Sequence, residues 1–197
     1  MTDARTDGLA PPADPGAGPG QFTLFTRWLH WVMALLIVAM IFIGAGMTAS
    51  LADYSLLVSV HEPLGAAVLF LAVVRLVNRL MHRGPALPKS MSASERLAAK
   101  ASEGLLYALM LAQPLIGWGM VSASGKPLAL FGTVDVPAVV PTDPELYAVL
   151  HRTHLVFGYA LFLLFTLHML AILVHVLVKR DGLFSRMALW KGPRRKR

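Results

Sequence analysis

The 197-residue sequence contains no cysteine and few charged residues. Without cysteine, disulfides, iron–sulfur clusters and thiolate metal sites are excluded, so any protein ligand to a metal must be histidine or a carboxylate. Only 15% of the residues are charged, 56% are hydrophobic, and the mean hydropathy is +0.61. An ordinary soluble domain carries about 25% charged residues. The composition therefore predicts an integral membrane protein.

The sequence contains three long runs without Asp, Glu, Lys or Arg. There are 25 uncharged residues between Arg27 and Asp53, 22 between Glu103 and Lys126, and 26 between Arg152 and Lys179. A helix that crosses a bilayer needs about 20 apolar residues, because lipid offers no partner to an unpaired backbone group. A further run carries Glu62 and Arg75 near its ends, where both side chains can reach the interface. We predict an all-α, integral membrane four-helix bundle with spans at about 28–48, 56–78, 102–121 and 153–178.

The basic residues are distributed unevenly. Eight of the 18 Lys and Arg lie in the segment 179–197 and six in the segment 75–100, whereas the segment 121–153 has only two. The positive-inside rule therefore predicts that both termini and the middle connection are cytoplasmic. Anionic membrane lipid is a sufficient partner for the net charge of +7, and nucleic acid is not needed.

The membrane domain is expected to occupy residues 22–187. Residues 1–21, rich in Pro, Gly, Ala and Asp, predict a disordered tail, and residues 188–197 a basic cytoplasmic tail. The first apolar run is long enough to span and is expected to be a retained helix, not a cleaved signal peptide. The segment between the third and fourth spans contains four prolines and is expected to form a short cap over the bundle.

Histidines occur at unusual places in these apolar runs. His154, His168 and His175 are spaced 14 and 7 residues apart, which keeps them within one stripe of a helix. Fourteen residues rise about 21 Å, enough for two sites stacked across the membrane. A histidine in hydrocarbon is costly unless it is paired or coordinated. The stripe therefore predicts a functional role.

A repeated pattern indicates what the outer histidines bind. The sequence HEPLG begins at His61 and HLVFG at His154, so Gly65 and Gly158 each lie one turn after a histidine. Glycine leaves room where a flat macrocycle would lie, and two imidazoles from facing helices suit the two axial positions of a haem iron. Such an iron has no vacant position, which favours electron transfer over oxygen binding.

A second haem is expected on the inner side, between His30 and either His168 or His175. Matching by depth favours His175, whereas the 14-residue spacing from His154 favours His168. Arg75 lies 14 residues after His61, level with His168, where it could neutralise a haem propionate. His82 and His151 lie in or beside loops and are expected to be solvated.

From Phe25 to Met187 the sequence resembles the prokaryotic cytochrome b561 family, small four-helix dihaem proteins of the bacterial inner membrane. The resemblance rests on RWLHW at 27–31, HEPLGAAVLFLAVVRLVNR at 61–79, QPLIGWGMVSASGKPLALFG at 113–132, the H-x3-G-Y motif from His154, the later histidines His168 and His175, and RDG at 180–182. It implies that His30 and His168 hold an inner haem b, and His61 and His154 an outer one. It also places His175 near a quinone site, although many members have a double histidine where this chain has His175-Val176.

The sequence and the resemblance together predict a dihaem b cytochrome that moves single electrons between a periplasmic-side donor and quinone, with ubiquinone as the expected redox partner. Some family members are similar to a superoxide oxidase, a superoxide:ubiquinone oxidoreductase. An alternative is the reverse path, from quinol to a periplasmic acceptor or partner subunit. Two other classes are a non-haem proton or metal-ion transporter that uses the histidine stripe, which would need acidic partners deep in the spans, and a structural membrane anchor.

Overall fold

The structure is a computed structural model that describes residues 20–82, 84–88, 91–130 and 134–190. Four long helices dominate it: α1 (Leu24–Ala49), α2 (Tyr54–Met81), α3 (Ala93–Ala123) and α4 (Pro144–Leu173). Helix α4 continues as a π-helical turn, η1 (Val174–Lys179). Each of the four long helices is long and apolar enough to cross a membrane, which confirms the predicted four-helix membrane bundle. The predicted tails lie outside the described residues, except for 20–21 and 188–190.

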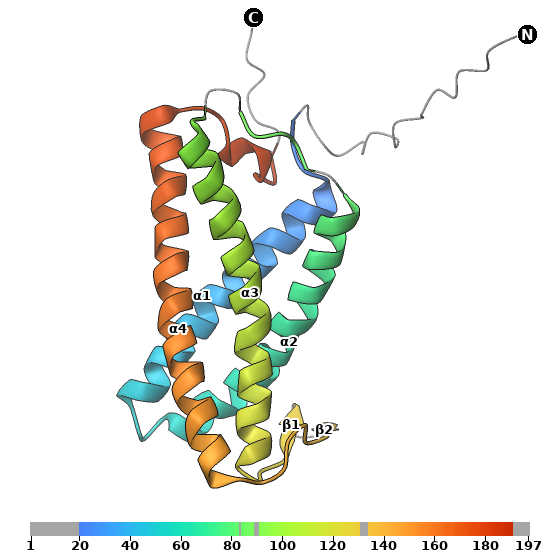
Figure 1. Ribbon diagram of the computed structural model, residues 1–197, viewed down its shortest axis with the longest axis vertical. Helices are drawn as coiled ribbons and strands as arrows, with labels where there is room; N and C mark the ends of the chain where they lie inside the picture. Colours follow the sequence, from blue (N-terminus) through green and yellow to red (C-terminus); the bar gives the residue numbers. More distant parts are fainter. Residues whose placement is uncertain (1–19, 83, 89–90, 131–133, 191–197) are drawn as a thin grey trace, which may run out of the picture.

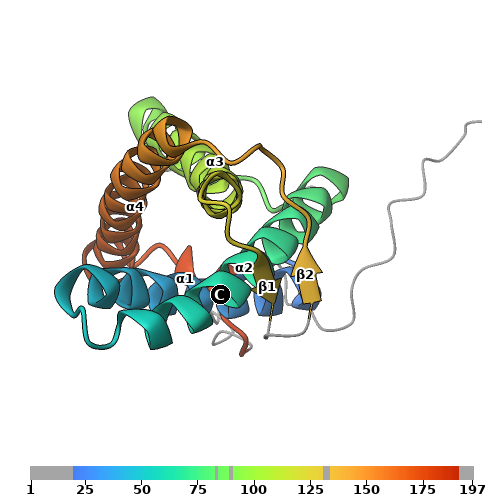
Figure 2. The same ribbon diagram turned by 90° about the horizontal axis from the view of Figure 1, so that it is seen from below.

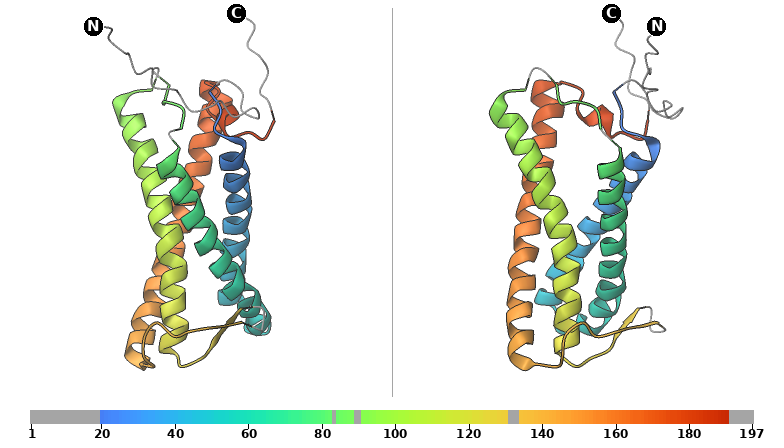
Figure 3. Two further views of the ribbon diagram at one scale, coloured as in Figure 1. Left: turned by 90° about the vertical axis from the view of Figure 1, so that its right-hand side faces the viewer. Right: turned by 45° about the vertical axis from the view of Figure 1, so that its right-hand side comes forward.

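The helices form two layers. Helices α1 and α2 lie side by side in one layer, and α3 and α4 in the other (Figure 2). The beginning of α1, the α2–α3 connection and the end of α4 lie at one end of the bundle (Figure 1). At the opposite end lies a small antiparallel hairpin of β1 (Leu128–Leu130) and β2 (Val134–Val136), visible in both views of Figure 3.

Buried side chains fill the interior at two levels. Leu29, Met33 and Ala72 form one cluster, and Ile37, Val68 and Leu161 form the other. Many large apolar side chains are instead exposed. Leu35 and Phe42, for example, are 72% and 73% exposed. A surface this apolar would be costly in water, and it suits a bundle surrounded by lipid.

Polar side chains fix where three of the helices begin. Thr23 caps α1 by accepting a hydrogen bond from the backbone N–H of Thr26, and Asp143 caps α4. In α3, Ser92 and Glu95 form a capping box, in which each side chain accepts from the other residue's backbone N–H. A cap of this kind contributes about 1 kcal/mol to helix stability.

The expected cap between α3 and α4 is the hairpin. Trp118 Nε1 donates to the Pro137 carbonyl at 3.0 Å, and the Val139 N–H donates to Ser122 Oγ at 3.2 Å. Both contacts tie the end of the hairpin to the last turns of α3. The segment therefore covers one end of the bundle and forms no separate domain.

The chain after α4 folds back over the start of α1. A short 3-10 helix, η2 (Phe184–Arg186), begins this return. Arg27, whose side chain is fully buried, donates from Nη1 to the Ala188 carbonyl at 2.8 Å. Trp31 Nε1 donates to the Met187 carbonyl at 2.9 Å. These bonds close the end of the bundle beside His30, which directly precedes Trp31.

Candidate functional site

Two histidines from different helices face each other near the hairpin end. The ring centroids of His61 in α2 and His154 in α4 are 6.1 Å apart, and the ring planes are 75° apart. Both Nδ1 atoms are buried, and neither has a hydrogen-bond partner among the described residues. The structure thus brings together the two residues that the sequence predicted as a pair.

The spacing of these rings fits one metal ion held between them. Two nitrogens that bind an ion from opposite sides lie about 4 Å apart, because each metal–nitrogen bond is about 2 Å long. Rings whose centroids are 6.1 Å apart can adopt this arrangement. No group of three or more His, Asp or Glu that could hold a metal occurs in the part of the chain that the structure describes. Two histidines alone supply only two ligands, and a porphyrin is one cofactor that could supply the others.

Helix α3 packs closely against His154. The Gln113 side chain donates from Nε2 to the His154 carbonyl at 2.8 Å. A Cβ added to Gly117 would lie 3.2 Å from Cε1 and 3.5 Å from Nδ1 of the His154 ring. A Cβ on Gly158 would lie 3.3 Å from Gln113 Nε2. Glycine at both positions lets the two helices approach each other here. Gly65 is less tightly enclosed, with Met40 Cε 3.7 Å from its added Cβ.

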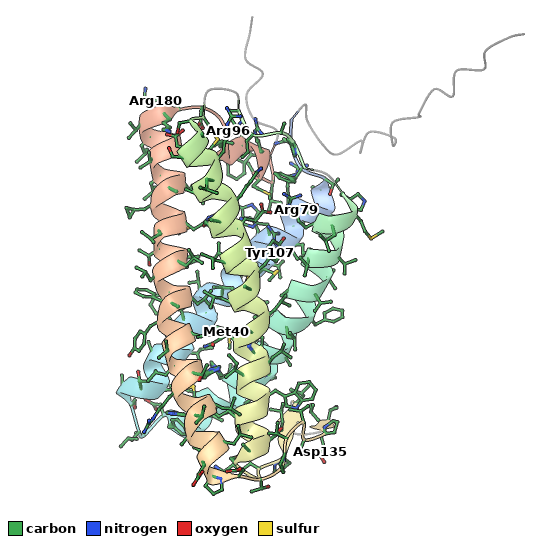
Figure 4. The ribbon with its side chains drawn as sticks, in the orientation of Figure 1. Met40, Arg79, Arg96, Tyr107, Asp135 and Arg180 are labelled. Carbon is green, nitrogen blue, oxygen red and sulfur yellow. The ribbon has the colours of Figure 1, made fainter. Side chains whose placement is uncertain are left out.

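The inner histidines lie toward the opposite end. His30 in α1 and His168 in α4 are close enough to interact electrostatically, and both also interact with Arg75 of α2. Arg75 lies over the ring of Tyr107, 5.9 Å from its centroid, and Nη1 lies 3.5 Å from the Thr26 carbonyl. The structure therefore gathers these three predicted residues from three helices. Figure 4 labels Tyr107 on α3 in the half of the bundle away from the hairpin.

His175 has a different neighbour. Its Nδ1 donates to Oδ2 of Asp181 at 2.6 Å, across the turn where Arg180 adopts the left-handed conformation with φ 49°. A carboxylate can only accept, so the ring carries its hydrogen on Nδ1. Asp181 also accepts from the Leu183 N–H. Partial burial alone would raise the pKa of Asp181, but these two hydrogen bonds hold that pKa below its usual range.

The remaining two histidines take part in neither pair. His82 follows α2, and its Nδ1 lies 3.1 Å from the Asn78 carbonyl. His151 stacks on Tyr147 near the beginning of α4, with ring centroids 5.8 Å apart. They are therefore suitable controls for variants of the paired histidines.

Charge differs between the two ends of the bundle. Arg96 and Arg180 lie at the end where α3 begins, whereas Asp135 lies on the hairpin (Figure 4). Lys126, near the hairpin, interacts electrostatically with Glu62, the neighbour of His61. One of the few basic side chains at this end is thus partly neutralised by a carboxylate.

Sequence reasoning did not identify Gln113 and Gly117 as neighbours of His154, or Tyr107 as a neighbour of Arg75. Gln113 carries the only side-chain amide in the uncharged run between Glu103 and Lys126, and this was the available signal. A polar group within a membrane span is expected to have a specific partner. Which partner it has depends on the packing of α3 against α4.

Comparisons with a family model and with individual known proteins both point to the same family. The family described as prokaryotic cytochrome b561 matches residues 21–190. The chain is 27% identical to cytochrome b561 homolog 2 of Escherichia coli (strain K12) over 172 residues, covering 86% of this chain and 92% of the relative. It is 28% identical to cytochrome b561 homolog 1 of the same organism over 180 residues, covering 89% and 99%. It is 26% identical over 160 residues to a Yersinia pestis protein named "Probable superoxide oxidase CybB", covering 81% and 90%.

Proposed function

The chain belongs to the prokaryotic cytochrome b561 family, and on this premise we propose that it is a dihaem b cytochrome that transfers single electrons between a periplasmic-side donor and the quinone pool of the respiratory chain. Family membership and four membrane-spanning helices make it a multi-pass protein of the bacterial inner membrane, and they imply that it binds haem b and acts in electron transfer.

The observation that carries the proposal is the facing pair His61 and His154, with ring centroids 6.1 Å apart and both Nδ1 atoms buried without a hydrogen-bond partner in the described part of the chain. These two residues would hold the outer haem. His30 and His168 would hold the inner haem, and Arg75, which interacts with both, would balance propionate charge. Haem held by these histidine pairs would supply one-electron redox chemistry.

The proposed orientation puts the hairpin in the periplasm. The basic residues at the other end, including Arg96 and Arg180, favour contact with the cytoplasm and with anionic lipid. The pair His61 and His154 then lies on the periplasmic side, and His175 on the cytoplasmic side.

Superoxide is the proposed donor. The name of the Yersinia pestis relative supports it. Two superoxide anions would each lose one electron and leave as dioxygen, and quinone would take up these two electrons with two protons. Lys126 and Arg152 would attract the anion toward the outer histidines.

The carboxylates at the hairpin end favour a second candidate. Asp135, Asp143, Glu145 and Glu62 oppose the approach of an anion, and the interaction of Glu62 with Lys126 weakens the attraction further. These groups suit a basic surface on a periplasmic acceptor or partner subunit. In that case electrons would flow outward from quinol.

The quinone would bind at the cytoplasmic side near His175. A cavity of about 320 Å³ lies there, lined by Met91, Ser92, Glu95, Lys179 and Asp181. Reduction of a quinone needs protons, and the His175 ring holds one on Nδ1, where Asp181 stabilises it. Asp181 lies beyond residue 178, the last residue of the predicted span, so the pair could exchange protons with the cytoplasm through this carboxylate.

The first experiment measures haem content. We expect two low-spin b haems per chain in the reduced-minus-oxidised spectrum and the pyridine haemochrome assay of the purified protein. His61→Ala and His154→Ala should each lose one haem and retain the other. The controls His82→Ala and His151→Ala should retain both. Unchanged haem content in the first two variants would overturn the ligand assignment.

A second measurement separates the two directions of electron flow. The oxidised protein is exposed to a superoxide-generating system or, separately, to a ubiquinol analogue. Faster reduction by superoxide, followed by reoxidation with a ubiquinone analogue, is expected. Reduction by quinol alone would favour the outward path.

A further inference from the structure

The Gln113 side chain joins α3 to the backbone of a proposed haem ligand. Its Nε2 donates to the His154 carbonyl at 2.8 Å. That carbonyl is also the helical acceptor for the N–H four residues later, at Gly158. The close approach of Gln113 Nε2 to this turn depends on the glycine, because a Cβ there would lie 3.3 Å from Nε2.

Two buried polar atoms at this contact remain unsatisfied. Gln113 Oε1 and His154 Nδ1 both lack a hydrogen-bond partner among the described residues. One is an acceptor, and the other becomes a donor when a neutral imidazole binds a metal through Nε2. Buried polar groups rarely stay unpaired, and metal-bound histidines almost always donate their second ring N–H.

The surrounding helices place the ring edge toward α3. Gly117 follows Gln113 by one helical turn, and its added Cβ would lie 3.5 Å from His154 Nδ1. The Nδ1 edge of the ring therefore faces the α3 surface that carries the unpaired Oε1. The side chain at 113 already contacts the same residue through its other amide atom.

We propose that Gln113 is a positioning residue of the outer haem site: Nε2 holds the His154 backbone, and Oε1 accepts the Nδ1 hydrogen of the His154 ring when that ring binds iron. This inference rests on the proposed function, because it requires the outer haem. The acceptor would make the imidazole a stronger electron donor and so stabilise the oxidised iron. Gln113 should therefore influence the potential of the outer haem and leave that of the inner haem unchanged.

The test compares two substitutions of opposite chemistry in the holoprotein. Gln113→Met keeps the length of the side chain and removes the acceptor, so the midpoint potential of the outer haem should shift upward. Gln113→Glu removes the amide donor but supplies a stronger acceptor, so that potential should shift downward. The inner-haem potential should stay constant in both. A purely structural role would not produce shifts of opposite sign.

Controls distinguish failure of this inference from failure of the proposed function. Leu115→Ala changes a half-exposed side chain two residues away and should leave both potentials unchanged. His61→Ala identifies which potential belongs to the outer haem. If the wild-type protein holds no outer haem, the proposed function itself fails. If it holds two haems and the two Gln113 variants shift the outer potential in the same direction or not at all, the inference alone is overturned.

A further variant keeps the test decisive if Gln113→Met lowers haem content. Gly117→Ala introduces a Cβ 3.2 Å from the His154 ring and leaves Gln113 intact. It should disturb the bond from the ring to Oε1, and so shift the outer-haem potential upward and alter the low-spin electron paramagnetic resonance signal of that haem. An unchanged potential and signal in this variant would contradict the proposal.

Discussion

The imidazole of His175 donates a hydrogen bond from Nδ1 to Oδ2 of Asp181 at 2.6 Å, although the two residues lie on either side of the turn that ends η1. Their side chains are only 18% and 15% exposed. The bond closes the turn that follows η1 and holds the segment that returns to α1.

This bond predicts a pH-dependent contribution to stability. The pKa of Asp181 is lowered in the folded protein, so the carboxylate stabilises the fold above its unfolded-state pKa of about 3.9. That contribution is lost as the pH falls through the lower, folded-state pKa. Asp181→Asn should therefore reduce the thermal unfolding midpoint at neutral pH, and the difference from wild type should shrink below about pH 4.

The measurement is thermal unfolding in detergent at several pH values, with Asp135→Asn on the hairpin as the matched control. We expect the control to show no such change. A difference between Asp181→Asn and wild type that stays constant across this pH range would show that the carboxylate charge is not what stabilises the turn.

The choice between the two inner histidines predicts a contrast between variants. His168 interacts with His30 and Arg75, whereas His175 hydrogen-bonds Asp181. His168→Ala should lose the inner haem. His175→Ala should keep both haems and lower the rate of quinone reduction by about tenfold or more, because a proton donor is removed. Loss of haem from His175→Ala, with two haems kept in His168→Ala, would assign the ligand to His175.

The orientation predicts the behaviour of reporter fusions. Green fluorescent protein fused after Arg197 should fluoresce, because that end is expected in the cytoplasm. Alkaline phosphatase should be inactive at the same position and active when fused after Pro137, at the hairpin end. The physical reason is the excess of Lys and Arg that resists translocation at the other end. Active phosphatase at the C-terminus would contradict the proposed orientation. The pair His61 and His154 would then lie on the cytoplasmic side, and the proposed path of the electrons across the membrane would be reversed.

The sequence was sufficient to predict the number and approximate position of the helices. Charge-free runs of 22 to 26 residues can satisfy their backbone in lipid only as helices. The helices are longer than the predicted spans, since α3 begins at Ala93 and α4 at Pro144. Caps at Ser92 and Asp143 start them in the polar region, where hydropathy carries no signal.

The sequence also determined which residue types form the candidate site. Without cysteine, histidine is the main metal ligand available, and the repeated H-x3-G motif singled out His61 and His154. Which rings face each other depends on how α2 and α4 are placed across the bundle. Only the tertiary structure decided this. It also decided that Gln113 lies against His154 and that Asp181 lies against His175. The first contact depends on the packing of α3 against α4, and the second on the turn after η1. No local pattern in the sequence encodes that packing or that turn.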